Sequence, residues 1–108
     1  MKVATHAFRD AFLAKKAVGF ALQFEDRTGP ATASPPFITQ KCDDRHVSVF
    51  VFETAVAAEE ERRIFPQNSR IQVCEVSVAE VKAFASIGYF DMPALVFLRD
   101  SMGAFAPL

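Results

Sequence analysis

Hydrophobic positions along this chain follow two periods, and the two kinds of segment largely alternate. In one kind, apolar residues recur three or four positions apart, as on one face of an α-helix: 7–17, 55–65 and 78–87. In the other kind, apolar residues alternate with period two or form short β-branched and aromatic runs: 20–24, 47–52, 71–78 and 94–98. This order predicts one α/β domain over residues 1–108, with helices flanking a mixed sheet of four or five strands.

The connections predict how the strands pair. Because strands alternate with helices, we expect crossover units and a mainly parallel sheet. Residues 99–103 are typical of a hairpin turn, so 104–108 should return as a short antiparallel edge strand.

Capping residues indicate where the helices begin and end. Thr5 is placed to cap the first helix, and Gly19 to end it in a left-handed turn. Pro66 stops the second helix. Ser77 and Glu80 match a capping box, which predicts a third helix directly after Ser77.

Residues 26–45 interrupt the periodic pattern. The segment is rich in Pro, Ser and Thr, a composition that favours a long exposed loop. Phe37 and Ile38 are the residues expected to attach its far end to the rest of the domain. Loops of this length in a small domain are usually either functional or disordered.

Composition narrows the class of partner. Twelve Phe and no Trp leave two interpretations, a phenylalanine-rich core or an exposed patch that binds a partner. A net charge of −1 argues against nucleic acid, whose binding depends on basic residues. No apolar run approaches the ~20 residues that span a bilayer. Lys15 and Lys16 also interrupt the N-terminal apolar stretch, so we expect neither a membrane segment nor a signal peptide, and we assign the protein to the cytoplasm.

Residues 87–98, which read IGYFDMPALVFL, resemble the most recognisable segment of thioredoxin-like proteins. There a helix ends at a Gly, and a Pro follows a bulky residue just before a buried strand. The resemblance implies a cis Met92–Pro93 bond, which physical chemistry alone makes uncommon. It also implies that 71–78, 47–52 and 94–98 are the matching family strands and lie side by side.

The chain departs from that family at the position of the redox motif. The family's cysteine pair would fall near residues 56–59, which read VAAE and hold no thiol. Cys42 precedes the central strand and Cys74 lies inside another strand, so the oxidoreductase and disulfide isomerase activities of the family are not expected. The family's C-terminal helix also has no counterpart, which leaves one sheet face uncovered unless the first helix or another chain covers it.

The closest branch, by resemblance, is the thioredoxin-like accessory proteins of nickel–iron hydrogenase maturation. Gly88, Phe90, Pro93 and Ala94 fit the late segment of that branch. The resemblance implies a non-catalytic chaperone or adaptor that binds an extended client segment, such as one from a hydrogenase subunit or its signal peptide, by strand addition. The expected contacts are Val56, Glu59, Asp91, Met92 and Pro93.

Other interpretations stay open. A thiol-based redox sensor, or an enzyme of another class, would act through Cys42. Cys42, Asp43, Asp44 and His46 could supply metal ligands or a Cys–His pair, although a solvated loop explains them equally well, and we expect no metal or cofactor. The run 59–63 reads as a solvated helix face or an acidic docking patch. A subunit of a larger assembly, or a homo-oligomer, would use the uncovered sheet face.

Overall fold

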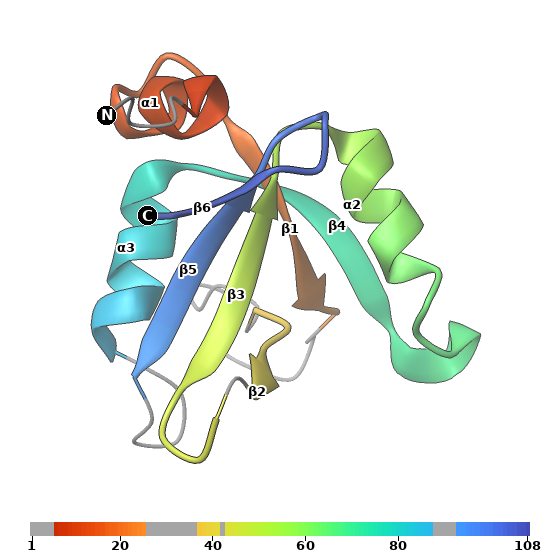
Figure 1. The fold of residues 1–108 in the computed structure, drawn as a ribbon. Helices are drawn as coiled ribbons and strands as arrows, with labels where there is room; N and C mark the ends of the chain where they lie inside the picture. Colours follow the sequence, from red (N-terminus) through yellow and green to blue (C-terminus); the bar gives the residue numbers. More distant parts are fainter. Residues whose placement is uncertain (1–5, 26–36, 42, 88–92) are drawn as a thin grey trace.

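A mixed β-sheet lies at the centre of the molecule, with helices on both of its faces (Figure 1). The computed structural model describes residues 6–25, 37–41, 43–87 and 93–108. In chain order the elements are α1 (Ala7–Leu13), β1 (Gly19–Phe24), β2 (Gln40–Lys41), β3 (Val47–Phe52), α2 (Ala55–Arg62), the short 3₁₀ helix η1 (Gln67–Ser69), β4 (Ile71–Val76), α3 (Val78–Ile87), β5 (Ala94–Arg99) and β6 (Phe105–Pro107). The expected α/β class is confirmed.

The strand order is β4-β1-β3-β5-β6, and β2 pairs with β3 beside this path. Only β3 and β5 run parallel among the described strands, while β1–β3, β1–β4, β2–β3 and β5–β6 are antiparallel. The expectation of a mainly parallel sheet is therefore wrong. The expected hairpin is confirmed, with β6 returning along β5.

The position of β1 explains the difference in pairing. β1 is buried on both faces over Ala21, Leu22 and Gln23, as suits an inner strand, whereas β4 leaves Glu75 exposed and suits an edge. β1 accordingly separates β3 from β4. Of the three segments expected side by side, β3 and β5 are neighbours and β4 is not.

Two apolar clusters hold helices against opposite faces of the sheet. The larger one packs α1 and α3 against the sheet through residues that include Phe12, Val81 and Leu98. The smaller one packs α2 against the other face through Ala58, Leu22 and Phe52. Side chains alternate along each strand, so two consecutive residues of β3, or of β5, point to opposite faces of the sheet.

The far end of the expected 26–45 loop is part of the sheet. Phe37 is buried and forms a bridge with Gln23, and the Ile38 N–H donates to the Leu22 carbonyl oxygen at 2.8 Å. β2 follows and pairs with the start of β3. The attachment expected at Phe37 and Ile38 is confirmed, whereas residues 26–36 and 42 of the expected loop lie outside the described residues.

The helix ends differ from expectation at α1 and agree at α3. His6, not Thr5, is the N-cap of α1, and Thr5 lies outside the described residues. The left-handed residue after α1 is Lys15, with φ of 61°, not Gly19. At α3 the capping box is present: the Glu80 N–H donates to Ser77 Oγ at 3.2 Å.

Gly19 has a packing role in place of the expected turn role. It is buried at the start of β1, and a Cβ built on it would collide with Val51 Cγ1 and come within 3.2 Å of Phe12 Cε1. A side chain at position 19 would thus occupy the space that lets α1 and β3 approach each other.

Candidate functional site: an uncovered sheet face

The side of the sheet that carries α2 is only partly covered. α2 packs on β4, β1 and β3, whereas α1 and α3 contact β5 through the opposite face. We call the remaining area the open face. It is formed by outward side chains of three adjacent strands: Phe50 from β3, Leu95, Phe97 and Arg99 from β5, and Phe105 and Pro107 from β6.

Three phenylalanines form the centre of the open face. The Phe50 and Phe97 rings lie side by side in the β3–β5 register, with centroids 6.0 Å apart and an interplanar angle of 29°. Phe50 also meets Phe105 edge-on at 5.7 Å. Phe105 is 56% exposed and Leu95 41% exposed. Aromatic pairs at these distances attract one another, so the rings form a defined apolar surface that remains open to solvent.

Arg99 borders this aromatic surface. Its guanidinium carbon lies 5.9 Å from the Phe52 ring centre and 5.5 Å from the Phe105 ring centre, within the range of cation–π attraction. Across residues 6–25, 37–41, 43–87 and 93–108, no carboxylate forms an ion pair with it. The rings therefore hold the cation in place while leaving its N–H donors available to a partner.

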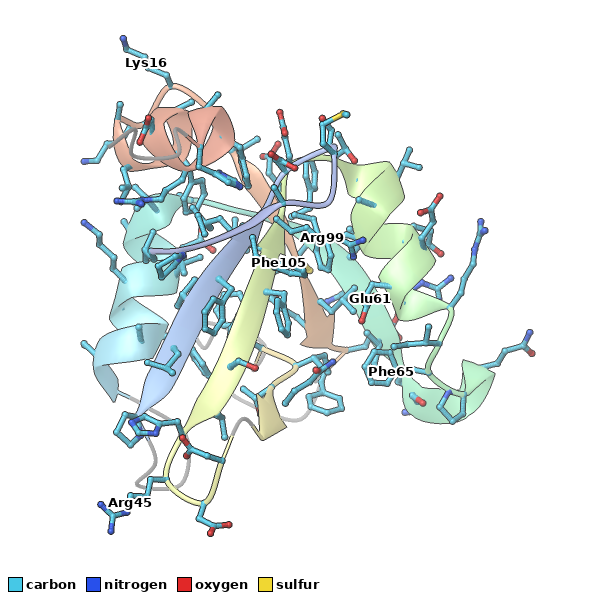
Figure 2. All side chains as sticks on the ribbon, in the orientation of Figure 1. Lys16, Arg45, Glu61, Phe65, Arg99 and Phe105 are labelled. Carbon is cyan, nitrogen blue, oxygen red and sulfur yellow. The ribbon has the colours of Figure 1, made fainter. Side chains whose placement is uncertain are left out.

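The wall of the open face on the α2 side is acidic. Glu60 and Glu61 line a pocket together with Arg99 and the hairpin turn that follows β5. Neither glutamate has an ion-pair partner within the described part of the chain. Figure 2 shows Glu61 and Arg99 on the same side of the sheet, with Phe105 beside Arg99.

An apolar groove continues from this wall toward β2. Its lining residues come from four strands or strand-like segments and from α2 with the turn after it: Leu22, Ile38, Gln40, Phe50, Phe52, Glu61 and Phe65. Phe50 belongs to both the groove and the open face, where its ring meets that of Phe105, and Glu61 belongs to both the groove and the acidic wall.

The residues expected to bind a client are not all brought together. Val56 and Glu59 lie on α2 and line a separate pocket with Val73, on the β4 side of that helix. Pro93 lies at the opposite end of the sheet, where its carbonyl oxygen accepts the Val47 N–H at 3.1 Å. The reason is the parallel pairing: β5 starts where β3 starts, whereas α2 begins beyond the end of β3, roughly 17 Å away along the strand. Asp91 and Met92 lie outside the described residues.

Two further expectations, client binding by Glu59 and strand addition next to β5, meet structural obstacles. The Glu59 carboxylate pairs with Arg62, which lowers the pKa of Glu59. β5 has neighbours on both sides, β3 and β6, so residues 97–99 offer no free edge for strand addition.

The polar loop before β3 is organised around Asp43. Its Oδ1 accepts the N–H groups of Arg45 and His46 at 2.7 and 2.8 Å, and the His46 ring lies 3.0 Å from it. The Arg45 N–H is the main reason that the pKa of Asp43 is lowered, followed by the His46 side chain. Cys42 lies outside the described residues, and the described His, Cys, Asp and Glu side chains do not gather into a metal-binding group of three.

Cys74 is a free thiol on the edge strand β4. It lies within a strand, as expected, and is half-buried. Burial raises the pKa of its thiol, and the Glu80 carboxylate adds to this effect. A raised pKa lowers the thiolate fraction at neutral pH and so makes the thiol less nucleophilic.

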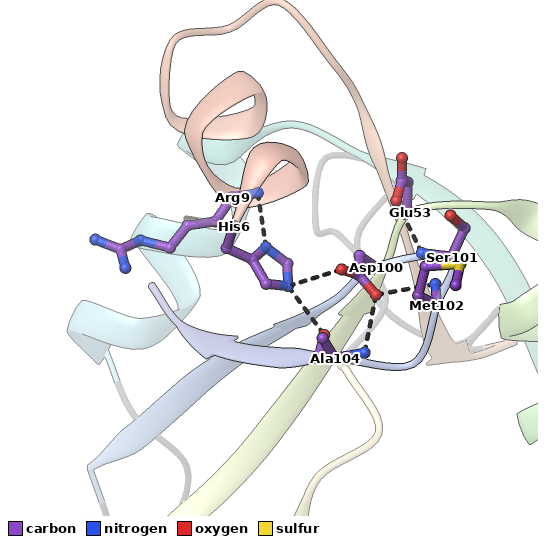
Figure 3. Close-up of polar contacts among 7 residues, drawn as sticks. All are labelled: His6, Arg9, Glu53, Asp100, Ser101, Met102 and Ala104. Carbon is purple, nitrogen blue, oxygen red and sulfur yellow. Dashed lines mark hydrogen bonds and ion pairs between the residues drawn. The ribbon is translucent and has the colours of Figure 1, made fainter. Parts of the chain in front are cut away.

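A polar network joins α1 to the β5–β6 hairpin (Figure 3). His6 Nδ1 accepts the Arg9 N–H at 3.1 Å, so in the neutral ring the proton is on Nε2, which donates to the Ala104 carbonyl oxygen at 2.9 Å. Asp100 Oδ1 accepts the Met102 and Ala104 N–H groups at 2.9 and 2.8 Å. These side chains form hydrogen bonds with main-chain N–H and carbonyl groups, so the network has a structural role: it holds α1 against the hairpin.

The sequence pointed to the open face only indirectly. Its high Phe content left an exposed patch as one interpretation, but the run 94–98 reads as uniformly apolar and hides which residues face outward.

The chain matches no protein-family model, no curated protein and no solved structure.

Proposed function

We propose that this protein is a non-catalytic adaptor or chaperone that binds another polypeptide through the open face. The observation that carries the proposal is the aromatic surface of half-buried Phe50 and Phe97 and exposed Phe105, beside a helix that covers only part of the same sheet face. Contiguous exposed apolar surface with a polar border is typical of protein interaction sites. Arg and Phe are also enriched at such interfaces.

The polar groups support binding over catalysis. His6, Asp43 and Asp100 each accept main-chain N–H groups that stabilise a helix end or a turn. These contacts lower the pKa of Asp43, so its carboxylate is stabilised as the anion and is a poor general base. The pKa of Cys74 is raised, which does not favour a thiol nucleophile.

A narrower form of the proposal retains the resemblance of residues 87–98. It describes a thioredoxin-like chaperone acting in the cytoplasm, with a hydrogenase subunit or its signal peptide as client. The absence of thiols from residues 56–59 fits a member without redox activity. The position of β1 between β3 and β4 does not support it. Binding through the open face does not depend on this assignment.

No helix in the described part of the chain is long and apolar enough to cross a membrane.

Site-specific photo-crosslinking in the native cells tests the proposal. A benzoylphenylalanine at position 105 should give a discrete covalent adduct, because Phe105 lies on the open face. The same group at Lys82, exposed on α3 at the opposite face, is the control and should give none. Equal labelling from both positions, or none from position 105, would overturn the proposal.

The crosslinked protein is then identified and its binding is measured with purified components. Phe97→Ser and Phe105→Ser should weaken binding at least tenfold, whereas Ile64→Ser, an exposed apolar position outside the open face, should not. Urea unfolding of each variant separates lost binding from lost folding. Phe105→Ser is expected to unfold near the wild-type urea concentration, because the side chain is more than half exposed.

A further inference from the structure

We infer that the occupant of the open face is an amphipathic α-helix of a partner protein, with basic residues along the edge that faces α2 and a carboxylate at the end that meets Arg99. This inference rests on the proposed function and names the partner's chemistry. Three observations carry it: the width of the uncovered sheet, its apolar centre, and the charges of both signs along its border that form no ion pair among the described residues.

The width of the uncovered sheet fits one helix. α2 packs on β4, β1 and β3, and the uncovered strands next to it are β5 and β6. Strands lie about 4.8 Å apart, so β5 is about 10 Å from β1 across the sheet. Helices packed side by side have axes 8–10 Å apart, which places the axis of a second helix over β5.

The surface beneath that axis suits an apolar helical stripe. Leu95, Phe97 and Phe50 are presented there, and Phe105 borders them from β6. A helix needs an apolar stripe about 100° wide to pack on such a surface, with residues three and four positions apart. Over residues 97–99, β5 is already paired on both sides, so an extended peptide lying there would gain no main-chain hydrogen bonds from it.

The charged border sets the partner's chemistry. Glu60 and Glu61 form the α2 side of the pocket, and neither is paired within the described ranges. By contrast, Glu59 on the same helix is paired with Arg62. Lys or Arg side chains along the adjacent edge of a docked helix would complement the two glutamates. Arg99, held by the Phe52 and Phe105 rings, presents donors that match a carboxylate.

Two designed helical peptides test the inference, measured against the intact protein by fluorescence anisotropy. Both carry the same leucine stripe. One has lysines on one edge and a glutamate at one end, and the other has these charges exchanged. The peptide with the lysine edge should bind at least tenfold more tightly, and its binding should shift the NMR signals of Leu95 and Phe97.

Charge-reversal variants of the protein provide the matched control. Glu60→Lys/Glu61→Lys should abolish or reverse the preference between the two peptides. Glu25→Lys/Glu75→Lys changes the net charge equally at exposed glutamates outside the open face and should leave the preference intact. Equal binding of both peptides, or a preference that survives Glu60→Lys/Glu61→Lys, overturns the inference.

Failure of the inference is distinguishable from failure of the proposed function. An adduct at position 105 with a partner, without any preference between the peptides, leaves the proposed function standing and rejects the helix. If light scattering shows that the wild type is a dimer and that Phe105→Ser is a monomer, the occupant is a second copy of this chain. This result also rejects the helix. Absence of both the adduct and peptide binding rejects the inference and the proposed function together.

Discussion

His6 Nε2 lies 2.9 Å from the carbonyl oxygen of Ala104, a residue 98 positions later in the chain. The contact ties the first described helix to the last hairpin (Figure 3). The same ring caps α1 by accepting the Arg9 N–H. One largely buried side chain therefore joins the two ends of the described fold.

We predict that His6→Ala lowers the free energy of unfolding by about 1–3 kcal/mol, since it removes an N-cap and a partly buried hydrogen bond. His6→Asn should recover part of the loss, because its amide oxygen can accept the Arg9 N–H. Urea unfolding measures both. The control is His46→Ala, whose ring contacts exposed Asp43, and it should cost less. An equal loss for the two alanine variants would contradict the role of His6.

Gly19→Ala should lower the free energy of unfolding by about 1–3 kcal/mol, because its Cβ would collide with Val51 Cγ1. Removing that methyl group makes room, so the double variant Gly19→Ala/Val51→Ala should lose less stability than the sum of the single variants. Thermal or urea unfolding of the four proteins gives the coupling. The costs of Gly19→Ala and Val81→Ala, which do not share this collision, should add. Additive costs for positions 19 and 51 would exclude the close approach.

Cys74 should react slowly with iodoacetamide. In a Cys42→Ser background at pH 8, we expect alkylation roughly threefold or more slower than in the urea-unfolded protein, because burial raises the pKa of the folded thiol. Mass spectrometry at timed intervals measures the rate. A folded thiol that reacts as fast as the unfolded one would contradict the raised pKa.

The raised pKa of Cys74 also predicts that the free energy of unfolding depends on pH. Above the ordinary thiol pKa the unfolded chain loses the Cys74 proton before the folded chain does. The contribution of Cys74 is therefore complete below that pKa and is lost as the pH rises through the raised folded value. Urea unfolding at pH 7 and pH 9.5 should show a larger loss for the wild type than for Cys74→Ala.

The Met92–Pro93 bond, of which Met92 lies outside the described residues, is predicted to be cis by resemblance to thioredoxin-like proteins. The ¹³C shifts of Pro93 Cβ and Cγ distinguish the two isomers directly. A cis bond would support the narrower, thioredoxin-like form of the proposed function. A trans bond would remove its main support and leave the open face unaffected.

Local pattern was sufficient to identify most of the elements. The capping box at Ser77 and Glu80 correctly located the start of α3, because both partners of that contact lie within one helical turn. The run 47–52 forms strand β3, as its β-branched and aromatic residues predicted. His6 was missed as the N-cap, because its role depends partly on Ala104, at the other end of the chain.

The sequence by itself determined the class of the domain, the positions of most helices and strands and the absence of thiols from residues 56–59, since these follow from local periodicity and residue type. Only the tertiary structure decided that β1 separates β3 from β4, that Pro93 and Val56 lie at opposite ends of the sheet, and that Phe97 and Arg99 face outward beside α2. Strand order depends on long-range burial: each strand takes the position where its apolar faces are covered, and no single segment encodes which neighbour provides that cover.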